Sequence, residues 1–135
     1  NDEFGHCAGD QVLQRLGQLL GKHLRSSDLK CRYGGEEFVV ILPEAESEVA
    51  ATVAEKMRRL ITKESFEFAD PPLQISASIG MATSQKRNFA SAEELIRAAD
   101  LAMLQAKREG RNCVRAYYPG AFACLPNLPA MALRR

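Results

Sequence analysis

Apolar residues recur at the spacing of an amphipathic α-helix in three stretches of the chain. The first stretch, residues 10–25, places Asp10 where an N-cap residue would stand. The second runs from Ser47, a candidate cap, to about Ile61. The third begins at the S-x-x-E capping box of Ser91 and Glu94, and Gly110 ends it. Three helices are therefore expected.

Short apolar runs between these helices predict β-strands. We expect strands over 30–33, 36–42, 65–70, 74–83 and 112–117. Gly34 and Gly35 favour a two-residue hairpin turn, because glycine accepts the positive φ that such turns need. Residues 118–135 hold three prolines and show no clear period, so a tail is expected there. The order α-β-β-α-β-β-α-β predicts an α+β fold with a mostly antiparallel sheet flanked by helices.

Composition narrows the class of protein. The 135 residues are enough for one domain. The 18 basic and 17 acidic residues give a net charge of +1, which offers no electrostatic reason to expect nucleic-acid binding. No run of 18 apolar residues occurs, so no membrane contact is expected from this segment. The four cysteines form no C-x-x-C pair, which favours free thiols in a reducing cytoplasm.

Glu36 and Glu37 are adjacent acids at the start of a strand that is otherwise apolar. Residues 38–42 are all apolar, which indicates a strand covered on both faces. The two carboxylates are then expected at the sheet edge beside the turn, on opposite faces of the strand. They are either solvated acids flanking a hairpin or part of a metal site. Mg²⁺ prefers carboxylate oxygens and leaves part of its shell to substrate phosphates.

The stretch R-Y-G-G-E-E-F, residues 32–38, resembles the signature of GGDEF domains, the diguanylate cyclases of bacterial signalling, in its GGEEF variant. Three further stretches resemble family motifs in the same order: N-D-x-F-G-H-x-x-G-D at 1–10, S-I-G at 78–80 and A-A-D-L-A-M-L-Q-A-K-R-E-G-R-N at 98–112. The resemblance covers residues 1–117.

The resemblance implies a palm-like sheet flanked by helices and a cyclase reaction. Two GTP-loaded domains would face each other as a homodimer and condense two GTP molecules into cyclic di-GMP, releasing pyrophosphate. Mg²⁺ or Mn²⁺ would be the cofactor. The domain would occupy residues 1–117 with an extension or tail at 118–135, and it would lie in the bacterial cytoplasm as the cytosolic part of a larger sensor protein.

The family's residue roles carry over to matching positions of this chain. Glu36 and Glu37 would be the catalytic residues and the metal ligands, and Glu36 is also the suggested base for the 3′-hydroxyl. The GTP-binding residues would be Asn1 and Asp10 at the guanine, Gly34 and Gly35 under the nucleotide, and Lys107 and Arg111 at the triphosphate. Two structural alternatives stay open: Asp10 as a plain N-cap, and Lys107 and Arg111 as cations that stabilise a helix C-terminus.

Arg25 and Asp28 form an R-x-x-D motif, separated from the glycine pair by residues 29–33. In the family this motif at this spacing is the inhibitory site for cyclic di-GMP, and an arginine fork suits phosphate and guanine edges. The alternative is an exposed salt bridge of little energetic value. Family members add an arginine from the second helix. Lys56 stands at that place here, and Arg58 or Arg59 could substitute for it.

The pattern departs from the family at the start of the chain. The family's first strand, which carries D-x-D/N-x-F-K and a metal-binding Asp, would precede Asn1. We therefore expect this chain to be a truncated part of an active parent domain. The alternatives are a non-catalytic receptor of cyclic di-GMP and a regulatory remnant. The intact pair of Glu36 and Glu37 argues against the receptor, which has no need of metal ligands.

Overall fold

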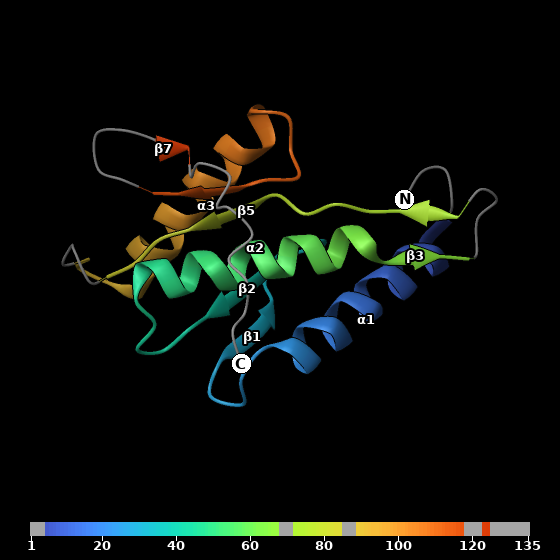
Figure 1. Cartoon of the computed structure of the whole chain (residues 1–135), viewed down its shortest axis with the longest axis horizontal. Coiled ribbons are helices and arrows are strands. Elements are labelled where there is room, and N and C mark those ends of the chain that lie inside the picture. Colours follow the sequence, from blue (N-terminus) through green and yellow to red (C-terminus); the bar gives the residue numbers. More distant parts are fainter. Residues whose placement is uncertain (1–4, 68–71, 85–88, 118–122, 125–135) are drawn as a thin grey trace. The chain divides into compact units, whose positions relative to one another are not determined.

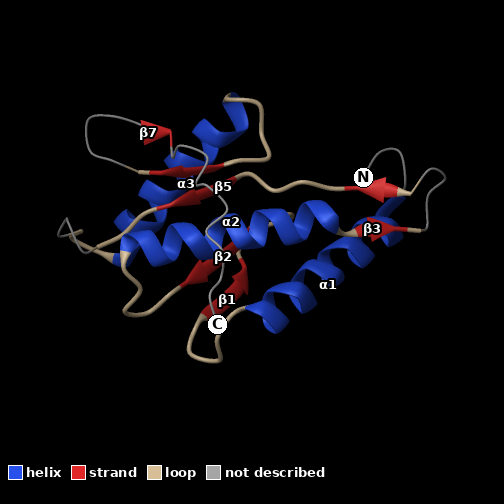
Figure 2. Cartoon of the chain, in the orientation of Figure 1, coloured by secondary structure: helices blue, strands red, loops and turns tan. Residues whose placement is uncertain are grey.

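The computed structural model describes residues 5–67, 72–84, 89–117 and 123–124 (Figure 1). It divides into two units, Asn1–Ala77 and Ser78–Arg135, each of which is described by itself. The first unit contains α1 (Gly5–His23), β1 (Leu29–Arg32), β2 (Phe38–Ile41), α2 (Ser47–Lys63), β3 (Ser65–Phe66) and β4 (Leu73–Gln74). The second contains β5 (Ile79–Met81), α3 (Ala92–Arg108), β6 (Val114–Ala116) and β7 (Ala123–Cys124). Long helices with short, mostly antiparallel strands confirm the predicted α+β class (Figure 2).

The three predicted helices are present, and two of their starts differ from the expectation. Helix α1 begins at Gly5, so Asp10 lies inside the helix and its interpretation as an N-cap is wrong. The residues before Asp10 are mostly polar, and their few apolar positions show no recognisable helical spacing. The sequence pattern therefore does not reveal where the helix begins. Helix α2 has Glu46 as its N-cap, with no side-chain capping bond, and Ser47 is its first helical residue. The prediction that Ser47 caps the helix is therefore also wrong.

The predicted capping box at the start of α3 is confirmed. Ser91 Oγ accepts a hydrogen bond from the Glu94 backbone N–H at 3.3 Å. Glu94 Oε2 in turn accepts from the Ala90 backbone N–H at 2.7 Å, one residue before the cap. Two amide groups at the helix start are thereby satisfied, which fixes where α3 begins.

Strands β1 and β2 form an antiparallel hairpin whose register runs from Leu29 opposite Ile41 to Arg32 opposite Phe38. The connecting turn is residues 33–37, so the two-residue turn predicted at the glycines is wrong. Among the described glycines only Gly110 has a positive φ. A turn of five residues reverses the chain without the left-handed backbone that a two-residue turn demands.

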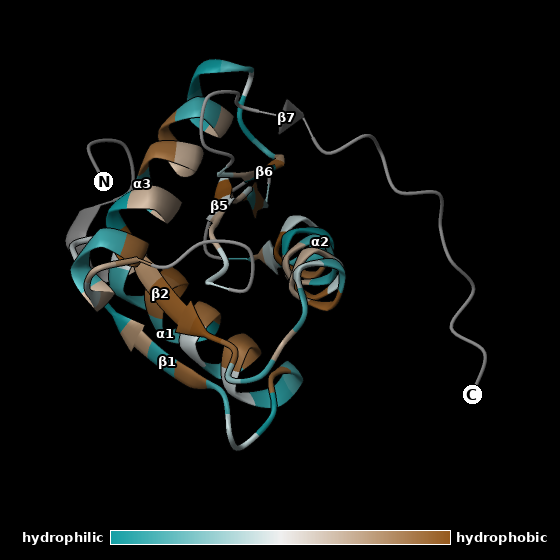
Figure 3. Ribbon diagram, turned by 90° about the vertical axis from the view of Figure 1, so that its left-hand side faces the viewer, coloured by the Kyte–Doolittle hydropathy of each residue, from teal (hydrophilic) through white to brown (hydrophobic). Residues whose placement is uncertain are grey.

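The hairpin is more exposed than its apolar sequence suggests. All four residues of β1 are exposed, and β2 is half-buried except at Ile41, which is exposed. The predicted covering of 38–42 on both faces is therefore wrong for this chain. In the described part of the chain β1 and β2 form a two-stranded sheet, and its burial pattern shows that no layer covers both of its faces. Figure 3 shows β2 as an apolar strand.

The predicted strand over 74–83 is two strands that belong to different sheets. β4 pairs antiparallel with β3, whereas β5 pairs parallel with β6. The sequence pattern is continuous across residues 75–78, and it cannot show that the pairing partner changes there. The parallel pairing follows from α3, which connects β5 to β6 as a crossover.

The predicted tail contains a strand. Ala123 and Cys124 form β7, which pairs antiparallel with β6 opposite Ala116 and Arg115. A two-residue strand is too short to leave a periodic pattern, so β7 could not be predicted from the sequence. The other residues beyond Tyr117 lie outside the described part of the chain.

Two further expectations concern thiols and membranes. Cys31 and Cys113 are free thiols, as expected, and the side chains of the other two cysteines lie outside the described residues. No helix in the described part of the chain has both the length and the apolarity needed to cross a membrane.

Helix α3 packs on β5 and β6 through small residues. Ala98, Ala102 and Ala106 are buried along one face of the helix. Gly80, in the middle of β5, lies so close that an added Cβ would come within 2.1 Å of the Ala99 carbonyl oxygen and 2.2 Å of the Met103 amide nitrogen. Only glycine fits between this strand and the helix backbone, because neither of these atoms can move independently of α3.

Replacing Gly80 with Ala should therefore destabilise the chain by about 3 kcal/mol, at the upper end of typical overpacking costs. Urea unfolding followed by circular dichroism would measure the loss. The matched control is Gly17→Ala, since Gly17 lies within α1 and a Cβ there would meet nothing within 4 Å. The control should raise stability by up to about 1 kcal/mol through helix propensity. Equal effects of the two changes would contradict the close packing at Gly80.

Candidate functional site

The turn at residues 33–37 carries both of the glutamates that the sequence singled out. The backbone N–H groups of Tyr33 and Gly34 both donate to the Glu37 carbonyl oxygen, at 2.8 and 3.3 Å. These bonds close the turn directly above the first pair of the hairpin, Arg32 and Phe38. Glu36 is exposed and Glu37 is half-buried. Both therefore belong to the turn and not to β2, which corrects the prediction that β2 begins at Glu36.

Arg32 holds the outer part of this turn. Its Nε donates to the carbonyl oxygens of Gly34 and Gly35 at 3.2 and 3.1 Å, and its Nη2 donates to Gly35 at 2.7 Å. Arg32 lies within the R-Y-G-G-E-E-F stretch, but this contact with the turn was not predicted from the sequence. The available signal was an arginine two residues before a pair of glycines. Glycines have no side chains to block a guanidinium from reaching their carbonyl oxygens.

Gly34 makes room for the side chain of Glu37. A Cβ on Gly34 would lie 3.2 Å from Glu37 Oε2 and 3.7 Å from Glu37 Cβ. At Gly35 an added Cβ would meet nothing within 4 Å. The two glycines therefore differ: Gly34 allows the carboxylate of Glu37 to fold back over the turn, while Gly35 borders open space.

The donor set of the turn fits a hard divalent cation. Two carboxylates stand next to each other in sequence, one exposed and one lying over a glycine. Mg²⁺ in nucleotide sites commonly takes one or two carboxylates and completes its shell with water and phosphate oxygens. Within the described residues, no group of three or more His, Cys, Asp or Glu side chains is placed to hold a metal. The turn therefore carries two carboxylates of the kind that such an ion prefers.

Asp10, one of the two residues predicted to read guanine, lies in α1. Asp10 is exposed, in the second turn of the helix. Its carboxylate can accept hydrogen bonds but offers no donor when ionised. Asn1 lies outside the described residues. Of the predicted guanine pair, the structure thus describes only Asp10.

Arg25 and Asp28 contact each other through the backbone. Asp28 Oδ2 accepts from the Arg25 backbone N–H at 2.7 Å, and the Asp28 N–H donates to the Arg25 carbonyl oxygen at 3.1 Å. Asp28 is only 7% exposed, whereas the Arg25 side chain is exposed. The alternative of an exposed salt bridge is therefore wrong. Asp28 shapes the turn after α1, and this turn presents the Arg25 guanidinium at the surface.

Glu55 engages both arginines that could replace the family's second-helix arginine. Its two carboxylate oxygens accept from Arg58 Nη2 and Nε, each at 2.8 Å, and Oε1 also accepts from Arg59 Nε at 2.8 Å. The Arg58 hydrogen bonds, with a further contribution from Arg59, lower the pKa of Glu55 from 4.5 to about 2 despite partial burial. Lys56 is exposed on the same helix. Arg58 and Arg59 thus both form ion pairs with Glu55.

Lys107 and Arg111 lie in the second unit, at the end of α3. The Arg111 N–H donates to the Ala106 carbonyl oxygen at 3.0 Å, which is the closing bond of a Schellman motif around Gly110. The φ values of Gly110, Arg111 and Asn112 are 104°, 62° and 46°. Three consecutive residues are thus left-handed, and two of them are not glycine. Such backbone persists only where the surroundings enforce it, and it is concentrated at functional sites.

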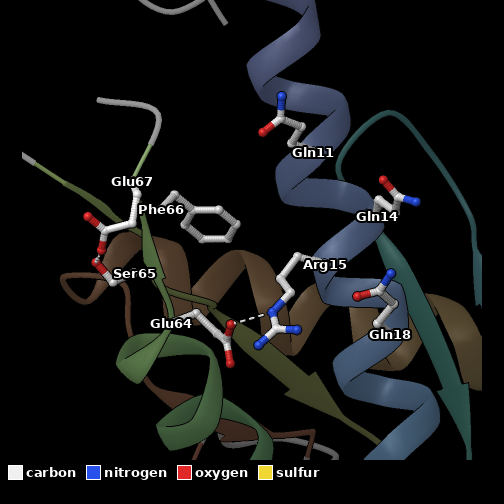
Figure 4. Close-up of a pocket in the computed structure, with 8 residues that line it drawn as sticks. All are labelled: Gln11, Gln14, Arg15, Gln18, Glu64, Ser65, Phe66 and Glu67. Atoms are coloured by element: carbon white, nitrogen blue, oxygen red, sulfur yellow. Dashed lines mark hydrogen bonds and ion pairs between the residues drawn. The ribbon is translucent and has the colours of Figure 1, made fainter. Parts of the chain in front are cut away.

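A groove of about 460 Å³ lies in the first unit (Figure 4). Described residues from α1 and from the end of α2 and β3 line it: Gln11, Gln14, Arg15, Gln18, Glu64, Ser65, Phe66 and Glu67. Arg15 Nε and Glu64 Oε2 form an ion pair at 2.6 Å across it. None of the described residues predicted to bind nucleotide lines this groove.

Comparison with known proteins defines the class. The family model for the diguanylate cyclase GGDEF domain matches residues 1–113. The chain therefore belongs to the GGDEF family. The domain boundary predicted at residue 117 lies close to the end of this match, and it stays a prediction.

The chain is similar to a named diguanylate cyclase and to a response regulator. It is 43% identical over 112 residues to diguanylate cyclase DgcP of Pseudomonas aeruginosa, covering 83% of this chain and 16% of that protein. It is 40% identical over 116 residues to the response regulator PleD of Caulobacter vibrioides, covering 84% of this chain and 25% of that protein. The chain thus spans a quarter or less of the length of these two relatives.

Solved GGDEF domains share the fold. The GGDEF domain of DgcB from Caulobacter crescentus, in complex with c-di-GMP, has a TM-score of 0.77 and 31% identity, covering 87% of this chain and 69% of that one. The active GGEEF domain of a diguanylate cyclase from Vibrio cholerae has a TM-score of 0.77 and 30% identity, covering 87% and 74%. The fold expected from the family resemblance is confirmed.

Glu55→Gln should lower the free energy of unfolding at neutral pH, because an amide loses the charge on which the bonds from Arg58 and Arg59 depend. The folded-state pKa of Glu55 is about 2, below its usual 4.5, so its stabilisation is complete above pH 4.5 and is lost as pH falls towards 2. Urea unfolding of both proteins across this range should show their difference shrinking with acidification. A difference that does not change with pH would contradict the ionised bridge.

Proposed function

We propose that this chain is part of a catalytic domain that condenses two GTP molecules into cyclic di-GMP and releases pyrophosphate. Membership of the GGDEF family and the similarity to named diguanylate cyclases support the reaction. The observation that carries the proposal is the turn at 33–37, where two carboxylates are intact and Arg32 and Gly34 fix the backbone beneath them. A protein that only bound the product would need neither carboxylate.

In this proposal Glu36 and Glu37 hold Mg²⁺ or Mn²⁺, which would neutralise charge on the phosphates of bound GTP. Glu36 is the more exposed of the two, and it is the candidate base for the attacking 3′-hydroxyl. Glu37 is the candidate for the more constrained ligand, since its carboxylate lies over Gly34. The open space at Gly35 leaves the backbone accessible to the nucleotide.

The remaining roles concern the two ends of GTP. Asp10 would accept hydrogen bonds from guanine N1–H and N2–H₂, with Asn1 as its partner, and it would reject adenine for lack of a donor. Lys107 and Arg111 would bind the triphosphate, the second from the left-handed loop after α3. Because each domain would load one GTP, the reaction would need a homodimer, in the bacterial cytoplasm where GTP is made.

Product inhibition is the second part of the proposal. The turn that Asp28 shapes presents an exposed arginine, and a guanidinium fork binds phosphate or a guanine edge with two bonds. Arg58 and Arg59 are held by Glu55, so Lys56 would supply the contact from α2. Cyclic di-GMP would then bind through Arg25 and Lys56, with Asp28 positioning Arg25.

Glu37→Gln in the full-length protein should lower the rate of cyclic di-GMP formation by more than about 100-fold, since loss of a direct metal ligand should exceed typical effects of outer contacts. Chromatography of the products from GTP and Mg²⁺ would measure the rate. The matched control is Glu48→Gln, the same change at an exposed residue in the first turn of α2, which should retain activity. Near-normal turnover of Glu37→Gln would remove this residue from the site.

Arg25→Ala should raise the concentration of cyclic di-GMP needed for half-inhibition by about tenfold or more, the value of one charge-assisted hydrogen bond. The initial rate should not change, because Arg25 has no role in GTP binding. Arg25 is chosen over Asp28, whose removal would also disturb the turn. Lys22→Ala, which removes an exposed cation at the end of α1, is the control. Inhibition that is unchanged by Arg25→Ala would exclude a binding role for this motif.

A further inference from the structure

Glu109 and Arg115 join the two ends of the left-handed loop 110–112. Arg115 Nε donates to Glu109 Oε2 at 2.6 Å, and Arg115 Nη2 contacts the same oxygen. The other oxygen of Glu109 accepts from Gln105 Nε2. Both carboxylate oxygens are thus engaged, one by the helix that precedes the loop and one by the strand that follows it. No role was predicted from the sequence for Gln105, Glu109 or Arg115.

The pair is anchored on the strand side by burial. Arg115 is 9% exposed, and its Nη1 also donates to the Val114 carbonyl oxygen at 2.8 Å. A guanidinium taken this far out of water requires its carboxylate partner, because an unpaired buried charge is costly. The hydrogen bonds from Gln105 and Arg115 lower the pKa of Glu109, so the carboxylate stays ionised at neutral pH. Glu109 is therefore an ionised side chain that is bonded to a buried arginine on the strand.

The loop between these residues needs such a tether. The left-handed backbone at Arg111 and Asn112 is unfavourable for residues that carry a Cβ, at about 1 kcal/mol or more each. Backbone bonds fix its flanks: Arg111 N–H to Ala106 O at 3.0 Å, and Ile79 N–H to Cys113 O at 2.9 Å. The ion pair adds a side-chain link across the loop, from the residue before Gly110 to a residue of β6.

Arg111 has no side-chain support of its own. Its side chain is exposed, and among the described residues it forms no hydrogen bond or ion pair. The backbone of the loop therefore sets the direction in which the Arg111 side chain leaves the main chain. Whatever holds φ at residues 110–112 also sets the region that the Arg111 guanidinium can reach.

We propose that the Glu109–Arg115 ion pair, supported by Gln105, is a positioning device that holds loop 110–112 in its left-handed form and so directs Arg111 towards the triphosphate of GTP. The proposal rests on the function proposed above and extends it to residues that do not touch the nucleotide. Arg115 and Glu109 are positioning residues, and their loss should affect recognition of the β- and γ-phosphates more than recognition of guanine.

The test compares Arg115→Met with Arg108→Met in the full-length protein. Both changes remove one cation near the end of α3, but Arg108 is exposed and lies outside the ion pair. Competition against a labelled, non-hydrolysable GTP analogue with Mg²⁺ gives the affinities for that analogue and for GMP. Arg115→Met should weaken the GTP analogue about tenfold or more, since misplacing a positioning group by about 1 Å can cost up to about 100-fold. The affinity for GMP should not change, and Arg108→Met should affect neither ligand.

Three further tests separate positioning from general stability. Hydrogen exchange of the peptide spanning 109–113 should become faster in Arg115→Met and stay slow in Arg108→Met. Glu109→Gln, an isosteric change at a partly exposed residue, should produce the same pattern even where Arg115→Met fails to fold. The double swap of Glu109→Arg with Arg115→Glu should recover part of the GTP affinity.

Equal weakening of the GTP analogue and GMP, an equal effect of Arg108→Met, or unchanged exchange at 109–113 would overturn the proposal. Failure of the proposed function looks different. In that case the wild-type protein would not bind the GTP analogue, or Arg111→Ala would leave its affinity unchanged. The exchange measurement would then still report whether the ion pair holds the loop.

Discussion

The hydrogen bonds from Arg32 to the carbonyl oxygens of Gly34 and Gly35 hold the turn on which the candidate site depends. A pair of glycines would otherwise be the most adaptable part of the hairpin, since glycine has the widest choice of backbone conformations. With these carbonyls held and the Glu37 carbonyl closing the other side, the two glutamates stand on a defined backbone. The chain thus combines room for a ligand with a fixed position for the carboxylates.

In the second unit, close packing holds the backbone that carries the residues proposed to bind the triphosphate. Gly80 and the buried alanines let α3 approach β5 and β6 so closely that its end is fixed with respect to the strands. Lys107 lies in the last turn of that helix, and the left-handed loop follows at once. In each unit the charged groups with proposed functions stand on backbone that hydrogen bonds or close packing hold in place. This arrangement suits phosphoryl transfer, in which positioning and charge account for most of the catalysis.

The sequence predicted what depends on periodicity and on recognisable motifs. The apolar spacing located all three helices, and the capping box located the start of α3. The length of the hairpin turn was missed, because a glycine pair fits turns of several lengths. Pairing partners were also missed: nothing in residues 74–83 shows that one half joins β3 and the other β6.

The candidate site shows the same division. Glu36, Glu37, Arg25 and Asp28 were found because their neighbours in sequence form motifs. Arg32 and the Glu109–Arg115 pair were missed because their roles lie in contacts, to carbonyl oxygens in one case and across a loop in the other. For Asp28, only the alternative of an exposed salt bridge was wrong, since burial and a bond to a backbone amide cannot be read from the identity of a residue.

The ion pairs of Arg58 and Arg59 with Glu55 affect how the proposed product inhibition would depend on ionic strength. A lysine meets a phosphate as a single hydrated charge, whereas an arginine forms two directed hydrogen bonds. Attraction between exposed point charges is screened over a Debye length of about 8 Å at physiological ionic strength. Feedback through Lys56 would therefore weaken as the salt concentration rises, and the level of second messenger at which synthesis stops would follow the osmotic state of the cell.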